Sequence, residues 1–328
     1  MEAVKKGVYI IQYEDVNITQ KISHMVSSVT YTDHMHGESD EIEITIEDSL
    51  NLWKSSWYPS KGNKIYMAVG WEGEKLMPCG TFQLDEMEFG LSPDTVSLRG
   101  IATQITSALR QKNSAAYENM TLEDVAGKIA ANHGYTVVGD FEKITFARIT
   151  QKQERDLAFL RRLAEAYGYI FKIVDTKLVF YKLEKIDAST AVHTLTRRDI
   201  TGGSLRDAVR TVYKGAQVSY SDPKTMKTIS HTVSDPSKVR GDIVKITDKV
   251  ENPQQAEARA KAALYQANYS EMEGSLSTMG NTKLVAGSTV VLSGFDRLDG
   301  KYKIEQSRHI VDRSGGYKTD IDVRRLNG

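Results

Sequence analysis

Two histidines separated by a single residue lie in a segment rich in carboxylates. His34 and His36 flank Met35, and the nearby acidic side chains are Asp33, Glu38 and Asp40. Alternate residues of a β-strand project from one face, and imidazole and carboxylate groups are common ligands of zinc. The spacing therefore raises the question of a metal site, with a polar loop between two strands as the alternative. We expect the loop, and no metal ligand.

Other reactive residue types occur without the partners that their chemistry needs. Cys79 is the one cysteine of the chain, which excludes an intramolecular disulfide, and we expect it to be buried. His309 falls in a segment of period two, where we expect an exposed or interface side chain. Asp85, Glu86 and Glu88 are close in sequence, but nothing in the sequence places two of them across a cleft as glycoside hydrolysis requires.

The common catalytic motifs are missing from the sequence. It contains no Gly-rich phosphate loop, no Gly-x-Ser-x-Gly elbow and no His-Glu-x-x-His pair. We therefore predict no catalytic residue, no cofactor-binding residue and no metal ligand, and a chain that is not an enzyme.

The composition is typical of a folded chain with several domains. Of the 328 residues, 40% are apolar and 26% are charged, which are ordinary globular values. Lys plus Arg equals Asp plus Glu at 43 each, so no global field favours a nucleic-acid partner. No stretch approaches the roughly 20 apolar residues that cross a bilayer, and the first residues lack the apolar region of a signal peptide. We expect synthesis in the cytoplasm and no membrane-spanning segment.

Periodicity divides the chain into three segments. Strand-type alternation dominates residues 7–99, which we assign to a first β-barrel module over 1–105. Residues 106–187 are expected to form a small α/β domain with two helices, the first opened by a capping box at residues 121–124 and the second spanning 154–167. Residues 188–328 should hold connecting strands, an alanine-rich helix after the N-cap Asn252, and a second β-barrel module. The predicted fold class is α+β, mainly β.

The strand pattern of the first module recurs near the C-terminus. Gly-x-x-apolar-x-apolar occurs at 62–67 and 287–292, Gly-x-aromatic-x-aliphatic-acid at 80–85 and 300–305, and aliphatic-x-aliphatic-Arg at 96–99 and 321–324. Three pieces in the same order predict one strand meander used twice, with two unrelated antiparallel sheets as the alternative. If the meander is duplicated, three chains present six similar modules, and a trimer would form a ring of pseudo-sixfold symmetry.

Residues 153–169 read Gln-Glu-Arg-Asp-Leu-Ala-Phe-Leu-Arg-Arg-Leu-Ala-Glu-Ala-Tyr-Gly-Tyr. This segment resembles the helix signature of the phage late control D family, the gp27-like baseplate hub proteins of contractile tails. Residues 298–302, 308–310 and 315–319 are similar to the closing strands of that family. The resemblance spans essentially the whole chain.

This resemblance implies a structural hub in a virion or phage-tail-like particle, assembled in the host bacterial cytoplasm. It implies a homotrimer with two tube-type β-barrel modules per subunit. The implied partners are the spike protein below and tail tube or adaptor proteins above, with tape measure and baseplate wedge proteins as further candidates. Phage, tailocin and other injection systems all stay open, as does the host.

Two questions remain open beside the hub assignment, a rival function and the role of one helix face. Residues 121–135 resemble a LysM-like segment, a helix opened by Thr-Leu and closed by Gly, which would indicate a peptidoglycan-binding tail or cell-wall module. On the second predicted helix, Arg155, Arg161 and Arg162 fall on the outer side. They form either a solvated face or a contact with another subunit.

Overall fold

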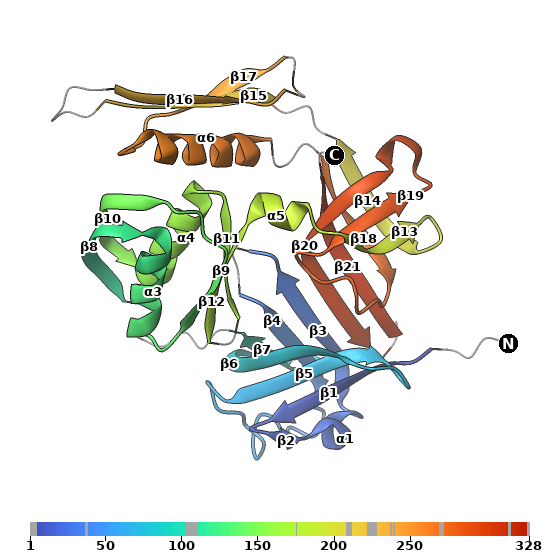
Figure 1. Ribbon diagram of the computed structural model, residues 1–328. Helices are drawn as coiled ribbons and strands as arrows, with labels where there is room; N and C mark the ends of the chain where they lie inside the picture. The colour runs from blue at the N-terminus through green and yellow to red at the C-terminus, as the bar shows by residue number, and fades with distance from the viewer. Residues whose placement is uncertain are drawn as a thin grey trace. The chain divides into compact units, whose positions relative to one another are not determined.

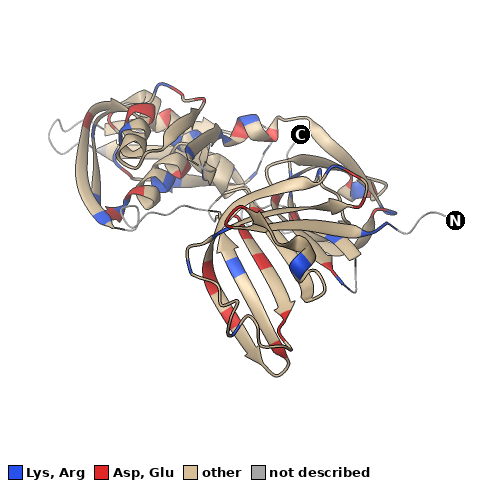
Figure 2. Cartoon of the chain, turned by 90° about the horizontal axis from the view of Figure 1, so that it is seen from below, with Lys and Arg blue, Asp and Glu red and all other residues tan. Residues whose placement is uncertain are grey.

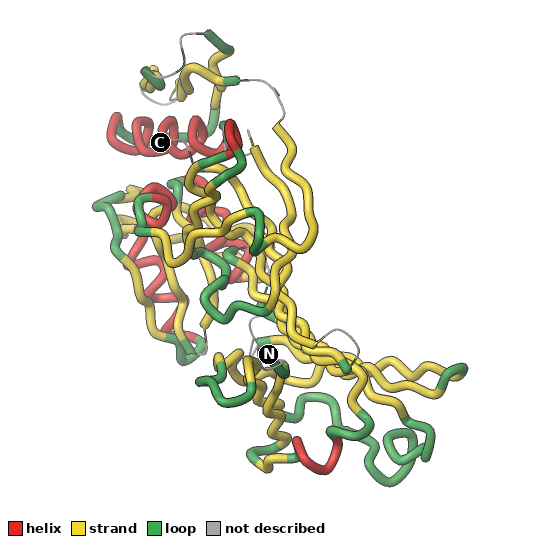
Figure 3. Tube along the Cα trace, turned by 90° about the vertical axis from the view of Figure 1, so that its right-hand side faces the viewer, coloured by secondary structure: helices red, strands yellow, loops and turns green. Residues whose placement is uncertain are grey.

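The computed structural model describes residues 5–36, 39–102, 111–174, 176–207, 212–221, 228–236, 238, 240–268, 272–313 and 316–326. The chain forms two compact units (Figure 1). The first unit comprises Met1–Gln104, Thr190–Leu205 and Gly274–Gly328, and the second comprises Ile105–Ser189 and Arg206–Glu273. The sequence predicts three consecutive segments, whereas in the structure both ends of the chain belong to the same unit. The expected fold class, α+β and mainly β, is confirmed, and helices (red in Figure 3) are concentrated in the second unit.

The first unit takes strands from both ends of the chain. The N-terminal module consists of β1 (Gly7–Tyr13), β2 (Val16–Asn17), α1 (Thr19–Ile22), β3 (Val26–His34), β4 (Glu41–Glu47), β5 (Lys64–Trp71), β6 (Met77–Leu91) and β7 (Asp94–Ile101). The C-terminal module consists of β13 (Ala191–Thr196), β14 (Ile200–Asp207), β18 (Met272–Met279), β19 (Thr289–Ser293), η1 (Asp296–Leu298), β20 (Gly300–Asp312) and β21 (Gly316–Arg325). All of these strands belong to one 13-stranded sheet.

The two modules pair their strands in the same order. The N-terminal module runs β3-β4-β7-β6-β5-β1, and the C-terminal module runs β14-β18-β21-β20-β19-β13. Each strand of one series corresponds to the strand at the same place in the other, both in the sheet and along the chain. One difference is that β1 is antiparallel to β5, whereas β13 is parallel to β19.

Residue-level register supports the equivalence of β6 with β20. Met67 faces Gly80 and Leu292 faces Gly300, so the first two pieces of the predicted repeat align without a gap. The pairing with the next strand shifts directly after Leu84 in β6 and directly after Ile304 in β20. A β-bulge therefore occupies the same place in each module.

The third piece of the predicted repeat is out of register by two residues. Leu98 faces Met87, and the matching position of β20, Ser307, faces Ile321 rather than Val323. The two arginines that end this piece, at positions 99 and 324, are therefore not equivalent. Short strand templates slide by two residues easily, because a shift of two keeps every side chain on its face.

Alternation along the strands buries one face of the sheet. In β6 and β20, every second residue after Gly80 or Gly300 points inward. These residues are Phe82, Leu84, Tyr302 and Ile304, and each is at most 1% exposed. The core of the N-terminal module also takes residues from the other end of the chain, including Val311. Cys79 lies in this core, and its burial raises the pKa of the thiol, as expected of a packing residue.

The modules are joined where the second half of β20 pairs with β3. Seven residue pairs connect them in antiparallel register, from Gln306 opposite His34 to Asp312 opposite Ser28. Of the two positions expected for His309, exposed or at an interface, exposure is wrong, because this junction buries the ring completely. Its ring stacks on Tyr31, with 6.2 Å between ring centroids.

Hydrogen bonds fix the protonation state of the His309 ring. Nε2 donates to the carbonyl of Leu284 at 3.1 Å, and Nδ1 accepts from the hydroxyl of Tyr317 at 2.8 Å. Both bonds suit a neutral imidazole. Burial lowers the pKa of His309 to about 4, so the ring is neutral at physiological pH.

We predict that His309 makes the junction sensitive to acid. Its pKa is about 4 in the folded chain, against 6.5 for an ordinary solvated histidine, so the unfolded chain takes up the proton first as the pH falls. The stabilisation is fully present above pH 6.5 and is lost between pH 6.5 and 4, by about 3 kcal/mol at most. Chemical denaturation of wild type and His309→Gln at pH 7 and 4.5 measures this. A wild-type decline no steeper than that of His309→Gln would contradict it.

The second unit contains two small sheets and a strand pair, covered by helices. Its elements are β8 (Lys112–Thr121), α3 (Leu122–Asn132), β9 (Thr136–Gly139), β10 (Thr145–Arg155), α4 (Asp156–Ala166), β11 (Tyr169–Val174), β12 (Lys177–Lys182), α5 (Leu183–Asp187), β15 (Tyr213–Ser221), β16 (Thr228–Ser234), β17 (Asp242–Ile246) and α6 (Pro253–Ala267). β8 pairs with β10, β12 lies between β11 and β9, and β15 lies between β16 and β17.

The predicted helix signals are present in this unit. Thr121 and Asp124 form a reciprocal capping box at the start of α3, and Asn252 caps α6 by accepting from the N–H of Gln255 at 2.8 Å. α4 begins at Asp156, two residues later than predicted, because the preceding residues extend β10. Among the described residues, no helix combines the length and apolar character needed to cross a membrane.

Candidate functional site on the polar face of the continuous sheet

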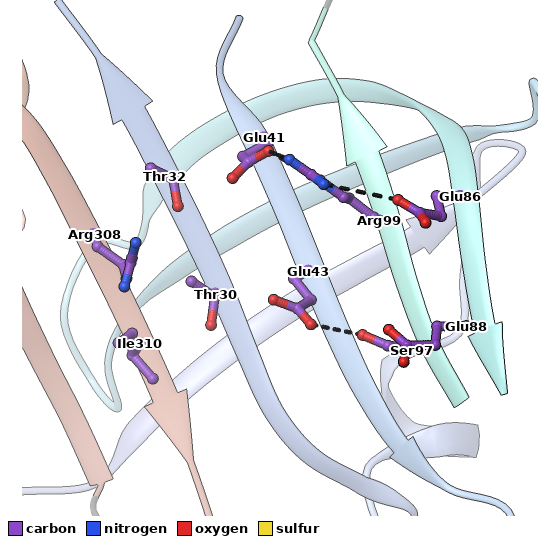
Figure 4. A pocket seen from close by; sticks show the side chains of 10 residues that line it. All are labelled: Thr30, Thr32, Glu41, Glu43, Glu86, Glu88, Ser97, Arg99, Arg308 and Ile310. Carbon is purple, nitrogen blue, oxygen red and sulfur yellow. Dashed lines mark hydrogen bonds and ion pairs between the residues drawn. The ribbon is translucent and has the colours of Figure 1, made fainter. Parts of the chain in front are cut away.

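The face of the sheet that points away from the core carries a hollow of about 410 Å³. Figure 4 shows its lining side chains on five neighbouring strands, β20, β3, β4, β7 and β6. They are Thr30, Thr32, Glu41, Glu43, Glu86, Glu88, Ser97, Arg99, Arg308 and Ile310. The hollow therefore spans both modules and depends on the pairing of β20 with β3.

Strand register aligns these side chains in rows. One row runs across the five strands through Ile310, Thr30, Glu43, Arg99 and Glu86, each directly opposite the next. Since alternate residues share a face, the residues two positions away in each strand join the same surface. The rows thus follow from the pleat and the register, including the β-bulge after Leu84 that places Glu86 opposite Arg99.

Carboxylates outnumber cations on this surface. Arg99 binds Glu41 through Nε at 3.0 Å and reaches Glu86 at 3.7 Å, and Ser97 donates to Glu43 at 2.7 Å. The hydrogen bond and charge of Glu41 raise the pKa of Arg99. Figure 2 shows acidic positions recurring along neighbouring strands of this sheet. The lining is thus more polar than apolar and carries an excess of negative charge.

The carboxylates singled out in the sequence separate in the structure. Glu86 and Glu88 line the hollow, whereas Asp85 is the residue displaced by the β-bulge and is exposed. Glu41 and Glu43, which sequence reasoning used only as a strand signal, complete the acidic surface. Their alternation with isoleucine could have marked them, but the neighbouring strands could not be read from the sequence.

The histidine segment lies at the end of β3. His36 Nε2 is 3.4 Å from a carboxylate oxygen of Glu305, and the backbone N–H of His34 donates to Asp40 at 3.0 Å. Asp33 is buried and accepts from the N–H of Ala286 at 2.9 Å. Glu38 lies outside the described residues. Within the described ranges, no three His, Cys, Asp or Glu side chains are grouped as a metal ion would need.

A second polar cluster in the second unit was not found from the sequence. Asp156 lies 2.7 Å from His133 Nε2 and accepts from Asn113 and Gln151 at 3.0 and 2.7 Å. Burial opposes ionisation of Asp156, but these hydrogen bonds hold its pKa below the usual value. The cluster joins the end of α3 to the start of α4. Of the arginines on α4, Arg162 pairs with Glu154 at 2.9 Å.

A model of one protein family matches most of the chain. The family is described as phage tail baseplate hub (GPD), and the match covers residues 83–315. This includes parts of both modules and all of the second unit. The chain belongs to the phage tail baseplate hub family. The resemblance to gp27-like hub proteins expected from residues 153–169 is thereby confirmed.

Individual relatives agree with membership of the baseplate hub family. The chain is 27% identical over 228 residues to a probable baseplate hub protein of Escherichia phage 186, covering 67% of this chain and 58% of that relative. The chain thus spans less than two thirds of the length of the curated relatives that it matches. Membership places the chain with the hub proteins of phage virions and phage-tail-like particles.

Solved structures share the hub fold. The 43 kDa tail protein of prophage MuSo2 from Shewanella oneidensis has a TM-score of 0.73 at 16% identity, covering 97% of this chain and 98% of that one. The E. coli c3393 protein has a TM-score of 0.55 at 14% identity, covering 92% and 74%. It is described as a component of the type VI secretion system with structural similarity to the tail proteins gp27 and gp5 of bacteriophage T4.

We predict that the ion pairs of this hub's polar face contribute little to stability. Arg99 and Glu41 are partly exposed, so Arg99→Ala should lower the free energy of unfolding by at most about 1 kcal/mol. The loss should shrink in 1 M salt, where charges are screened within about 3 Å. Ser97→Ala is the matched control, since it removes a neutral donor from the same surface. Equal salt dependence in both variants would contradict this assignment.

Proposed function

We propose that this chain is the structural baseplate hub of a contractile tail or related injection system. In this proposal it forms a homotrimeric, pseudo-hexameric ring that joins the tail tube to the central spike. The observation that carries the proposal is the strand order used twice in one continuous sheet. Three chains with two equivalent modules present six similar units, which is what a threefold spike needs to meet a sixfold tube.

The polar face supports a role that is geometric rather than catalytic. Arg99 pairs with Glu41, Glu43 accepts from Ser97, and the lining side chains follow the strand rows. In the proposed ring this surface lines the central opening. A hydrated acidic lining resists adhesion of apolar or acidic cargo, and the chain acts by holding its partners in register.

The partners in this proposal are the spike protein on one side and tail tube or adaptor proteins on the other. Tape measure and baseplate wedge proteins are additional candidates. Family membership and the likeness to a type VI secretion component support this choice. No sequence-specific contact with nucleic acid is proposed, because the chain carries balanced charge.

The proposal is tested by the mass and symmetry of the assembled protein. Native mass spectrometry of the full chain alone should give three times the 36.7 kDa of one chain, and with its spike protein it should give a heavier complex that contains three copies of the chain. Electron microscopy should then show a ring with six similar lobes. A strict monomer at high concentration that also fails to trimerise with its spike would refute the proposal.

A second measurement separates the hub from the peptidoglycan-binding alternative. We expect the full chain to remain in the supernatant when it is sedimented with purified cell-wall sacculi. A known peptidoglycan-binding domain serves as the positive control. Saturable co-sedimentation of the chain would favour the cell-wall module over the hub.

A further inference from the structure

The two central strands of the modules differ in how many partners they have. β20 pairs with β19 through its first residues, with β21 along its length, and with β3 from Gln306 to Asp312. The equivalent strand β6 pairs with β5 up to Gln83 and with β7 from there to Leu91. Among the described strands, the end of β6 thus has no counterpart of β3, and one of its edges is open.

Burial shows the same asymmetry residue by residue. Ser307 and His309 are fully buried and Val311 is 4% exposed at the junction, where β3 covers them. Leu91, at the position equivalent to Val311, is 82% exposed. Phe89, equivalent to His309, is half-buried against Tyr58, with 5.6 Å between the ring centroids. Leu91 is thus left in water where the other module buries Val311, and Phe89 is less buried than His309.

The strand that would complete this pattern is β14, at the far end of the sheet. β14 is the counterpart of β3, and β18 is its one neighbour in the described part of the sheet. β3 is largely buried, whereas six of the eight residues of β14 are exposed. An open strand edge is a template for pairing with another chain unless it is protected. The open end of β6 and the free edge of β14 thus match the two sides of the internal junction between β20 and β3.

We propose that the end of β6 in one copy of this chain pairs with β14 of a second copy, repeating between copies the β20–β3 junction found within each. This inference rests on the proposed trimer and specifies how it closes. Because the two edges differ, the contact is head-to-tail, and it forms a closed ring if the rotation between copies divides a full turn. With two modules per chain, each 120° step would contain one internal junction and one between copies.

The register of this contact follows from the equivalences. The backbone N–H of Gly280, directly after β18, donates to the carbonyl of Tyr317 in β21 at 2.9 Å. This hydrogen bond sets the pairing of β18 with β21 and makes Leu276 the counterpart of Ile44. The backbone of Gly203 lies against Leu276, as Val29 lies opposite Ile44. Gly203 is thus the counterpart of Val29.

Three residues after Gly203 in β14, this register places side chains of opposite charge opposite each other. Arg206 becomes the counterpart of Thr32, which faces Arg308 inside the chain. Since Glu88 corresponds to Arg308, Glu88 of one copy lies opposite Arg206 of the next. Both side chains are exposed in the single chain, and a directly opposed pair of opposite charge favours this register over its neighbours.

Disulfide trapping in the full chain tests the contact. Directly opposed residues bring their Cβ atoms to roughly 4.5–5.5 Å, close to disulfide geometry. Under mild oxidation, Glu88→Cys combined with Arg206→Cys should give dimers and trimers on non-reducing gels. Glu88→Cys with Val192→Cys is the matched control, because Val192 is exposed on β13 of the same module and is not on β14. Equal trapping in both pairs would overturn the proposal.

Charge reversal provides a test that does not depend on disulfide geometry. Glu88→Arg and Arg206→Glu, each alone, should weaken trimer formation at least about tenfold, because like charges then face each other. The two reversals together should restore it, measured as the trimer fraction against concentration by analytical ultracentrifugation. A stable trimer that neither single reversal weakens overturns this interface while leaving the hub function standing. A wild-type chain that never trimerises, even with its spike, overturns both.

Discussion

The structure depends on the antiparallel pairing of β20 with β3, which links residues from opposite ends of the chain. This ladder turns two separate meanders into one sheet, and it encloses His309 and Val311 beside residues of the N-terminal module. It also brings Arg308 and Ile310 next to Thr30 and Thr32, so the hollow on the polar face exists because of it. The closing of so long a loop is entropically unfavourable, and the buried apolar contacts along both strands offset that cost.

The equivalence of the modules has a local physical basis. Gly62 and Gly287 both adopt positive φ, at 87° and 80°, and each donates its N–H to the strand residue that precedes the bulge, at 2.7 and 2.8 Å. Glycine reaches this backbone region without a steric penalty, so it fixes where each meander begins. The bulge then sets the register of the next strand. Turn chemistry and one irregular residue per module are enough to reproduce the same pairing twice with little side-chain identity.

The sequence predicted features that depend on neighbours along the chain. Alternation located the strands of the N-terminal module, and caps located α3 and α6. The first two pieces of the repeat aligned because each begins, in both modules, at a glycine with positive φ. Features that depend on distant strands were missed or misread. His309 looks like any polar residue in a strand until β3 covers it. The polar face was also beyond reach, because Glu43, Arg99 and Glu86 become neighbours only through strand order.

One part of the second unit, Arg206–Glu273, is inserted in the C-terminal module between β14 and β18, the place where the N-terminal module connects β3 directly to β4, whereas the other part, Ile105–Ser189, lies between the two modules in sequence. Two strands that are neighbours in a sheet keep their ends close together, so the chain can leave and return there without disturbing any ladder. An insertion at this connection can therefore change in length or content while the ladder between β14 and β18 is kept. Related chains can in this way differ in what they carry beside the sheet and still share its strand order.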